Sequence, residues 1–407
     1  MSCSEWKEYK LDEVCLEITD GSHSSPKSVD KGYPMASVKD MNYFDISIDT
    51  CRQISEEDYN KLTKGNCKPK VNDVLIAKDG SYMKHVNVVK EEKDLVILSS
   101  IAILRPNVDI INPNFLKYYL LSPSIKQDLE QGYVSGSAIR RIVLKDFRRF
   151  PINLPPLEEQ EKIADILSSL DDKIELNNEM NKTLEEMAQS IFKRWFVDFE
   201  FPNENGEPYK SSGGEMIESE LGMVPKGWEV GSFSDISEIL DSKRIPLSKR
   251  EREKRANIYP YYGAASLMDY VDDYIFEGIH VLMGEDGTVI DKDGFPILQY
   301  VGGKFWVNNH AHVLKGKNEF SNEFVYLYLS NTNVTHLVTG AVQPKINQKN
   351  LTSLKLPIPD KNMTVKFNSL AKNIFEDIYE IRQENKKLEE IRSILLPVLM
   401  NGTINIK

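Results

Sequence analysis

Basic and hydrogen-bonding side chains are concentrated in a few short segments of this chain. Residues 137–149 carry five Lys and Arg residues and a single acid. Arg binds phosphate or reads guanine through two hydrogen bonds, and Gln reads adenine. The candidates for nucleic-acid contact in this segment are Arg140, Arg141, Lys145, Arg148 and Arg149. Two shorter polar segments further along the chain add Lys243 and Arg244, and Gln343, Lys345 and Lys349.

Three polar turns add further candidates. Residues 20–23, 78–81 and 285–288 each contain an Asp-Gly pair, which favours a tight turn. Polar side chains at such tips suit contacts with the grooves of DNA. The candidates from these turns are Ser22, His23, Lys78, Ser81 and Thr288. The clusters are a stronger prediction than any one member, because single exposed charges are common on protein surfaces.

Catalytic motifs do not accompany these clusters. The sequence has no GxxxxGK[ST] phosphate loop, no Gly-rich cofactor motif and no Asn/Asp-Pro-Pro-aromatic tetrad of the amino-methyltransferases. Glu91-Glu92-Lys93 fits a nuclease Glu-x-Lys only as a triplet that often arises by chance. His310-Ala311-His312 has strand spacing, but no carboxylate or Cys is arranged near it in the sequence, so an ordinary strand pair is favoured over a metal site. We therefore predict no catalytic residue and no metal site.

The net charge of −11 is unusual for a protein that binds DNA, but the excess acid is localised. Residues 157–200 hold 12 acids and 5 basic residues, whereas residues 1–156 hold 22 of each. Residues 224–360 are close to neutral, with 17 acids and 15 basic residues. Any DNA-binding face must therefore come from local clustering of basic side chains.

The cysteines and the apolar runs bear on the compartment. Cys3, Cys15, Cys51 and Cys67 form no CxxC pair, so reduced thiols are expected rather than a disulfide scaffold or a zinc site. No apolar run reaches the length of a membrane span, and the N-terminus lacks the apolar stretch of a secretory signal. We expect a cytoplasmic protein with no membrane partner.

The second half of the chain repeats the first. Residues 181–186 recur as 385–390 and residues 136–142 as 340–346, both at an offset of 204. Further upstream, Asp79-Gly80 corresponds to Asp286-Gly287 and Ala102 to Ala311. Two repeats are too few for a solenoid, so we predict two pseudo-symmetric globular domains, each followed by a long helix.

Short apolar runs bounded by Asp-Gly, Asn and Pro predict strands joined by tight turns within each repeat, as at residues 74–77, 96–98 and 101–104. Residues 115–120 and 324–329 fit short helices packed on a sheet. Periodicity does not distinguish helix from strand in runs this short.

The two long helices are the clearest predicted elements. Apolar residues recur at alternating steps of four and three between residues 163 and 195 and again between 367 and 399, which is the period of a coiled coil. Pro155 and Pro156, followed by two acids, suit the start of the first helix. Arg392 interrupts the second apolar seam.

Asn177, Asn181 and Asn385 lie in these seams and are expected to fix the helix register, because a buried Asn penalises other registers. Antiparallel pairing centred on the two seams places Asn177 opposite Asn385. Parallel pairing places Asn181 opposite Asn385 instead. The sequence leaves both arrangements open.

One combination of segments resembles a known family. Residues 152–160, Ile-Asn-Leu-Pro-Pro-Leu-Glu-Glu-Gln, lead into a helix that ends Lys-Arg-Trp-Phe-Val-Asp-Phe at residues 193–199. Together with residues 18–23 and 221–228, they closely resemble specificity subunits of type I restriction–modification systems over essentially the whole chain. The second junction, at residues 356–360, lacks the Glu-Glu-Gln, so the two helix starts are not strictly equivalent.

The resemblance implies an α/β (α+β) fold with two strand-rich target-recognition domains, separated by two long helices that pair antiparallel. We place the recognition domains at residues 1–156 and 224–360. The central and C-terminal spacer helices are expected at residues 157–200 and 361–402, and a linker at 201–223.

The same resemblance implies the function and the partners. Each recognition domain of such a subunit reads one half of a split, asymmetric site in double-stranded DNA. Two modification subunits dock on it to form an adenine methyltransferase, and restriction subunits join to form an ATP-dependent endonuclease. S-adenosylmethionine, ATP and Mg²⁺ belong to those partners, and this chain is expected to bind none of them.

Two other classes of function are kept open. One is a self-sufficient DNA nuclease or methyltransferase with degenerate motifs, which would act on DNA without partners. The other is a coiled-coil scaffold with no DNA role, which would retain no specific DNA even together with a methyltransferase.

Helix length generates a first prediction. Inserting one heptad into each long helix adds about 10 Å to each, and should lengthen the spacer between the half-sites by roughly three base pairs. Sequencing of methylated adenines measures the spacer directly. An unchanged spacer in the inserted variant would exclude the helices as the ruler.

Overall fold

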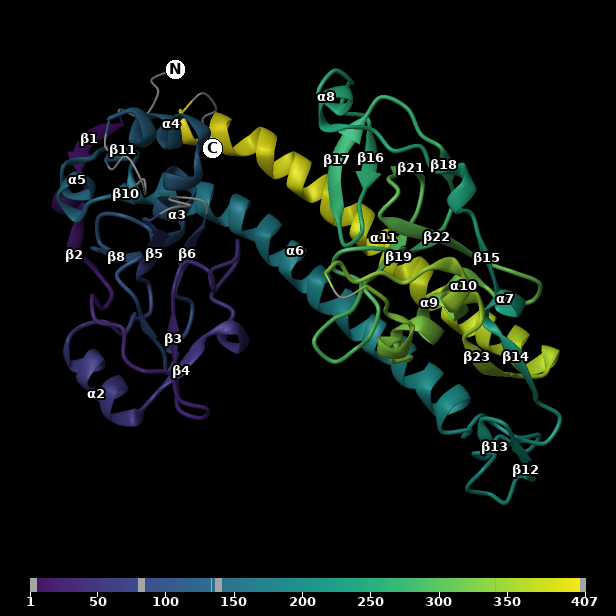
Figure 1. The fold of residues 1–407 in the computed structure, drawn as a ribbon. Helices are drawn as coiled ribbons and strands as arrows, with labels where there is room; N and C mark the ends of the chain where they lie inside the picture. Colours follow the sequence, from purple (N-terminus) through teal and green to yellow (C-terminus); the bar gives the residue numbers. More distant parts are fainter. Residues whose placement is uncertain (1–5, 80–84, 133, 136–140, 341, 403–407) are drawn as a thin grey trace. The chain divides into compact units, whose positions relative to one another are not determined.

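A computed structural model describes residues 6–79, 85–132, 134–135, 141–340 and 342–402. It contains short strands joined by tight turns and two long helices (Figure 1). The chain divides into two units, each of which includes part of both long helices. Unit 1 comprises residues 1–178 and 383–407, and unit 2 comprises residues 179–382. Within the described residues, no helix is long and apolar enough to cross a membrane.

Unit 1 is built on two small sheets. The first is antiparallel, in the order β2 (Cys15–Asp20), β8 (Ile101–Pro106), β5 (Val74–Ala77) and β6 (Val86–Val88). The second has the order β4 (Arg52–Ile54), β3 (Tyr33–Ala36) and β7 (Val96–Ile97). A separate pair joins β1 (Lys7–Lys10) to β11 (Pro151–Leu154), and another joins β9 (Val134–Ser135) to β10 (Arg141–Ile142).

Helices complete unit 1. The short ones are α1 (Leu11–Val14), α2 (Glu56–Lys64), α3 (Pro113–Leu121), α4 (Pro123–Gly132) and α5 (Leu144–Arg149). Asn112 caps α3 by accepting from the backbone N–H groups of Asn114 and Phe115. Phe115 and Tyr118 of α3 are buried with Leu104 of β8, so the apolar run at 115–120 is a helix packed in the core beside the sheet, as predicted.

Unit 2 repeats this plan. One sheet has the order β15 (Ser237–Ile239), β22 (Ala311–Gly316), β19 (His280–Gly284) and β20 (Leu298–Val301). Another has the order β17 (Leu267–Val271), β16 (Tyr259–Tyr262), β21 (Lys304–Val307) and β18 (Phe276–Glu277). The remaining strand pairs are β14 (Glu229–Ser232) with β23 (Lys355–Ile358) and β12 (Met216–Ser219) with β13 (Gly222–Pro225). The short helices are α7 (Phe233–Ile236), α8 (Lys249–Arg252), α9 (Asn322–Ser330) and α10 (Gln348–Thr352).

The strand registers refine the correspondence between the repeats. Ala102 of β8 pairs with Ile76, the residue before the last of β5, and His312 of β22 pairs with Met283 at the same place in β19. The structural counterpart of Ala102 is therefore His312, and the sequence match of Ala102 with Ala311 was wrong by one residue. The same registers make Asp20 equivalent to Asp241, since Asp20 pairs with Ala102 and the pairing of Ile239 with Leu314, continued for two residues, places Asp241 opposite His312.

The long helices are α6 (Leu157–Phe192) and α11 (Lys361–Met400). In unit 1, Asn177 of α6 donates to Asn385 of α11 at 2.8 Å. In unit 2, Phe192 of α6 packs edge-on against Phe367 of α11, with ring centroids 5.6 Å apart. A later residue of α6 thus contacts an earlier residue of α11, so the two helices pair antiparallel. Asn181 is also buried, in unit 2.

Arg392, the residue that interrupts the apolar seam of α11, has a charged partner. Its guanidinium donates to the buried carboxylate of Asp171 on α6 and lies 4.1 Å from the centre of the Tyr43 ring. Lys117 and Tyr118 of α3 donate to the same carboxylate, at 2.9 and 2.8 Å. The ion pair therefore joins both long helices to the globular part of unit 1.

The first long helix ends among buried aromatic side chains. After α6 the chain makes a π-helical turn, η2 (Lys193–Val197), in which one extra residue is accommodated. Trp195 and Phe196 are both buried there, and the Phe196 ring packs at a tilt against Trp228 and edge-on against Phe324. The Trp-Phe pair of the sequence motif thus belongs to the core of unit 2.

The Asn pair generates a prediction about stability. Asn385→Ala should lower the free energy of unfolding by about 1–3 kcal/mol, because one N–H of the buried Asn177 amide loses its acceptor. Urea unfolding followed by helical circular dichroism measures this loss. The exposed neighbour Lys386→Ala is the control and should change stability by less than about 0.5 kcal/mol. Equal losses in both variants would contradict a register role for the Asn pair.

Candidate functional site

The polar turns predicted from the sequence meet at one place in each unit, which we call the tip. In unit 1 the tip comprises residues 20–23, 78–79, 98–100 and 141–142. In unit 2 it comprises residues 241–244, 285–288, 308–310 and 343–346. These segments are held by backbone hydrogen bonds at matching positions, so the two tips share one backbone framework.

Two backbone hydrogen bonds define that framework. Lys78 N–H donates to Ser100 O at 3.0 Å, and Glu285 N–H donates to His310 O at 2.8 Å. Ile142 N–H donates to Lys78 O at 3.1 Å, and Ile346 N–H donates to Glu285 O at 2.9 Å. In addition, the backbones of Asp79 and Arg141 form an isolated antiparallel β-bridge, and those of Asp286 and Lys345 form the matching one. The recurrence of residues 136–142 as 340–346 therefore has a structural basis.

In unit 1 the centre of the tip is an ion pair. Lys78 Nζ lies 3.3 Å from Asp20 Oδ2, and both side chains are less than a tenth exposed. His23 Nε2 lies 3.2 Å from the other oxygen of Asp20, while the His23 ring is largely exposed. Ser22 is buried, and its hydroxyl donates to Ser24 O at 2.8 Å. Of the predicted residues in these turns, His23 therefore faces solvent, whereas Lys78 and Ser22 face inward.

The basic segment after this tip divides into different roles. Arg141 is exposed beside Asp79, and Lys145 is exposed on α5. Arg148 donates to Ile18 O of β2 at 2.8 Å, and Arg149 forms an ion pair with Asp146 at 2.6 Å. The candidates Ser81 and Arg140 lie outside the described residues.

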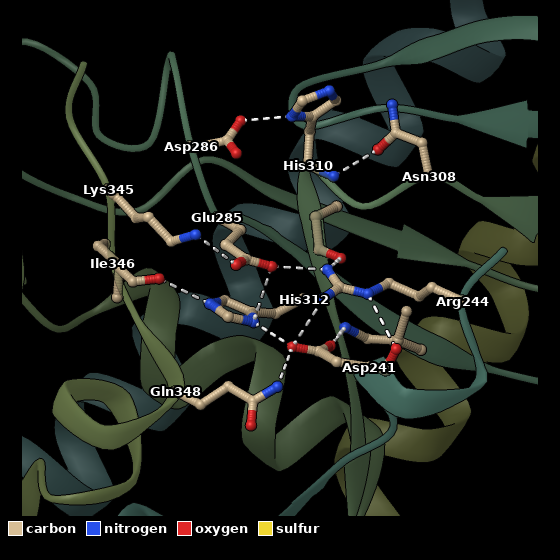
Figure 2. A network of polar contacts seen from close by, with 12 residues as sticks. Asp241, Arg244, Glu285, Asp286, Asn308, His310, His312, Lys345, Ile346 and Gln348 are labelled. Atoms are coloured by element: carbon tan, nitrogen blue, oxygen red, sulfur yellow. Dashed lines mark hydrogen bonds and ion pairs between the residues drawn. The ribbon is translucent and has the colours of Figure 1, made fainter. Parts of the chain in front are cut away.

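In unit 2 the tip is a larger buried network, shown in Figure 2. One oxygen of Asp241 accepts from Val313 N–H at 2.9 Å, and the other from His312 Nδ1 and Gln348 Nε2 at 2.6 and 2.7 Å. Arg244 lies beside it, with one guanidinium nitrogen 2.7 Å from Glu285 Oε2 and 2.6 Å from Ala311 O. The remaining oxygen of Glu285 lies 3.0 Å from Lys345 Nζ.

The two buried acids of this network are stabilised as carboxylates by the groups that contact them. Burial opposes ionisation of Asp241, but hydrogen bonds from His312 and Val313 and the charge of Arg244 outweigh it, so the pKa of Asp241 lies below its ordinary value. Burial likewise opposes ionisation of Glu285, and hydrogen bonds from Arg244 and Lys345 lower its pKa below the ordinary value. Both groups are therefore carboxylates at neutral pH.

Asp241, Glu285 and His312 each offer one ligand atom, and these atoms lie within 4.8 Å of one another. His312 Nε2 faces Ile346 O at 2.8 Å and Nδ1 faces Asp241, so both ring nitrogens point at protein acceptors. Arg244 and Lys345 already supply the positive charge that a metal ion would bring. The donor set thus fits an internal ion network better than a cation site.

The structure brings most of the predicted residues of unit 2 together. Lys243, Thr288, Gln343 and Lys345 are exposed at the tip, and Lys349 is exposed on α10. Arg244 is instead almost buried in the network. His310 lies in the turn before β22, not in the strand, so the expectation of an ordinary strand pair at 310–312 was wrong for that residue.

Sequence reasoning did not name Asp241 or Gln348, and it did not place Glu285 and His312 in one network with them. One signal was present: an acid lies at or just after the end of the first strand of the sheet, as Asp20 at the end of β2 and as Asp241 after β15. Recognising it requires the strand registers, because the offset between the repeats changes along the chain.

Comparison with known proteins identifies the family. The family described as type I restriction modification DNA specificity domain matches residues 3–186 and 225–393, one match for each repeat. The chain belongs to this family. It is a specificity subunit of a type I restriction–modification system, the component that is named for DNA specificity and not for catalysis. Neither a self-sufficient enzyme nor a scaffold without a DNA role is supported.

Individual relatives agree over almost the full length. The HindI specificity subunit of Haemophilus influenzae is 24% identical and aligns with 98% of this chain and 100% of its own. The putative MjaX specificity subunit of Methanocaldococcus jannaschii is 26% identical over 99% of this chain and 94% of its own. The crystal structure of the S subunit from M. genitalium shares the fold, with a TM-score of 0.59, 16% identity and coverage of 99% and 97% of the two chains.

The network of unit 2 generates a prediction. Asp241→Asn should lower the stability of unit 2 by about 3–5 kcal/mol, because it removes a buried charge that His312 and Arg244 face. Urea unfolding monitored by tryptophan fluorescence measures the loss. Glu253→Gln, which breaks only the exposed pair with Lys249, is the control and should cost less than about 1 kcal/mol.

The pH dependence has a definite sign. The folded-state pKa values of Asp241 and Glu285 are depressed, so their contribution to stability is present above about pH 4 and is lost as the pH falls through the folded values. The wild-type protein should therefore lose more stability between pH 6 and about pH 3 than Asp241→Asn does. Parallel acid profiles would contradict the assignment of Asp241 as an ionised group.

Proposed function

We propose that this subunit reads a two-part, asymmetric site in double-stranded DNA, with one half bound by each unit through its tip. By binding this site, the subunit directs adenine methylation and DNA cleavage, which partner subunits carry out. The family supports DNA specificity as the role of the chain, and the tips support the division into halves.

The observation that carries the proposal is the relation between the two tips. Both have the same backbone framework, from Lys78 N–H to Ser100 O in unit 1 and from Glu285 N–H to His310 O in unit 2. Asp20 and Asp79 recur as Asp241 and Asp286, but other matching side chains differ: Lys78 corresponds to Glu285, Ser100 to His310 and Ala102 to His312. One framework with two sets of side chains suits two different short sequences, and therefore an asymmetric site.

Exposure divides the predicted residues into two roles. The exposed basic side chains suit phosphate contacts, which position a protein on DNA without reading its sequence. These are Arg141, Lys145, Arg149, Lys243, Lys345 and Lys349. Lys78 and Arg244 are buried in ion pairs and are better suited to hold the tip loops in place. His23, Thr288 and Gln343 are exposed, uncharged or titratable groups suited to base edges.

The division of labour among subunits follows the family. We place two modification subunits and the restriction subunits on this chain, with S-adenosylmethionine, ATP and Mg²⁺ bound by those partners. The sequence supports this, since it has neither a phosphate loop nor a methyltransferase tetrad. Such a complex acts on DNA, so we place it in the cytoplasm.

A domain exchange tests the proposal. Replacing residues 224–360 by the matching segment of a relative with another specificity should change one half of the methylated motif and leave the other half unchanged. Sequencing of methylated adenines in cells that carry the partner subunits reads both halves at once. The matched control replaces residues 201–223 and should leave the motif unchanged.

Two outcomes would contradict the proposal. A change in both halves after the exchange would mean that the units do not read separately. Methylation or cleavage by the purified chain alone, with S-adenosylmethionine and Mg²⁺, would mean that the chain is itself an enzyme.

A further inference from the structure

His310 is a polar residue of the unit 2 tip whose imidazole has one nitrogen that no described residue contacts. Its ring is held at one nitrogen, with Nδ1 2.6 Å from Asp286 Oδ1. Its backbone N–H donates to Asn308 Oδ1 at 2.8 Å, which fixes the turn that carries it. The side chain is 48% exposed, and Nε2 has no partner among the described residues. Figure 2 shows the His310–Asp286 pair apart from the His312 network.

The equivalent residue of unit 1 is Ser100, because Ser100 O and His310 O accept the same framework hydrogen bond. The Ser100 hydroxyl is buried and finds no partner within the described part of the chain. At this position unit 1 therefore has a short, recessed side chain, whereas unit 2 has an oriented ring that projects from the same backbone. The difference concerns the side chain alone.

The contact with Asp286 decides what the exposed nitrogen offers. A carboxylate only accepts hydrogen bonds, so the proton of a neutral imidazole lies on Nδ1. In the neutral ring, Nε2 is then a hydrogen-bond acceptor whose direction is fixed by the hydrogen bond from Nδ1–H to Asp286. In the major groove, the complementary groups are the amino groups of adenine N6 and cytosine N4.

Several other charged groups of this tip contact one another, whereas Lys243 is exposed. Arg244 and Glu285 lie within the network, and Lys345 Nζ is taken up by Glu285. His312 is fully buried with both ring nitrogens occupied. Among these, His310 is the side chain that combines exposure, a fixed orientation and an unused hydrogen-bonding atom.

We propose that His310 is a specificity-determining residue, which reads an amino-bearing base, adenine or cytosine, in the half-site bound by unit 2. Asp286 is its positioning residue. The inference rests on the proposed function, since it requires that the unit 2 tip contacts DNA. It adds to that function the protein atom that contacts the base, Nε2 of His310, and the class of base contacted. It also explains why the two units would read this position differently.

The test uses the complex with its modification subunits and DNA duplexes randomised in the half-site assigned to unit 2 by the domain exchange. His310→Ser places the unit 1 residue at this position. The variant should lose discrimination at one base pair by about three- to tenfold, which corresponds to one lost hydrogen bond. Discrimination at all other base pairs should be unchanged. Sequencing of methylated adenines gives the preference at every position.

Variants of Asp286 test the positioning role. Asp286→Ala frees the ring and should weaken discrimination at the same base pair as His310→Ser. Asp286→Asn keeps an oxygen that accepts from Nδ1–H, and should restore much of the preference. His336→Ser removes an exposed histidine elsewhere in unit 2, and is the matched control that should leave the motif unchanged.

Several outcomes would overturn the inference. Unchanged preference in His310→Ser, while the wild-type complex methylates a defined motif, would exclude His310 as a reader and leave the proposed function intact. A uniform loss of methylation without a change of preference would indicate a phosphate contact. Selection of guanine or thymine at the affected position would exclude the acceptor role of Nε2. A wild-type complex without any sequence preference would end both this inference and the proposed function.

Discussion

A buried carboxylate at the end of β2 in unit 1, and just after β15 in unit 2, is the constraint on which the tips depend. Asp20 and Asp241 occupy equivalent positions, and each is removed from water by the strand ends around it. A buried charge is costly unless it is paired and hydrogen-bonded. Each unit meets this need with different groups: Lys78 in unit 1, and His312, Arg244 and a backbone N–H in unit 2. The pairing draws basic loop residues inward and fixes the loops that carry the exposed ones.

Within each tip, some residues hold the loops in place and neighbouring exposed residues are free to contact DNA. The inward-facing ion pairs and the backbone hydrogen bonds hold the loops, so exposed positions can change without altering the fold. Ser100 and His310 illustrate the principle, because the same carbonyl hydrogen bond supports a recessed hydroxyl in one unit and an oriented imidazole in the other.

The long helices follow the same logic of buried polar contacts. Asn177 donates an amide hydrogen bond to Asn385 in the seam, and Asp171 and Arg392 form a buried ion pair on the same two helices. Such groups contribute less to stability than apolar side chains of equal size would, but they penalise shifted registers. The acidic excess of residues 157–200 lies mainly on exposed positions and is compatible with this seam.

The sequence by itself determined the repeat, the two long helices, the strand-rich domains and the family, because periodicity, turn residues and junction motifs are local signals. It also located the turns that form the tips, since Asp-Gly pairs specify tight turns wherever they fold. Only the tertiary structure decided which polar residues face inward, as Lys78 and Arg244 do, and which remain exposed, as His310 does. It also chose antiparallel over parallel pairing for Asn385. Burial and pairing depend on residues far apart in the chain, such as Asp241 and His312, and strand register alone brings them together.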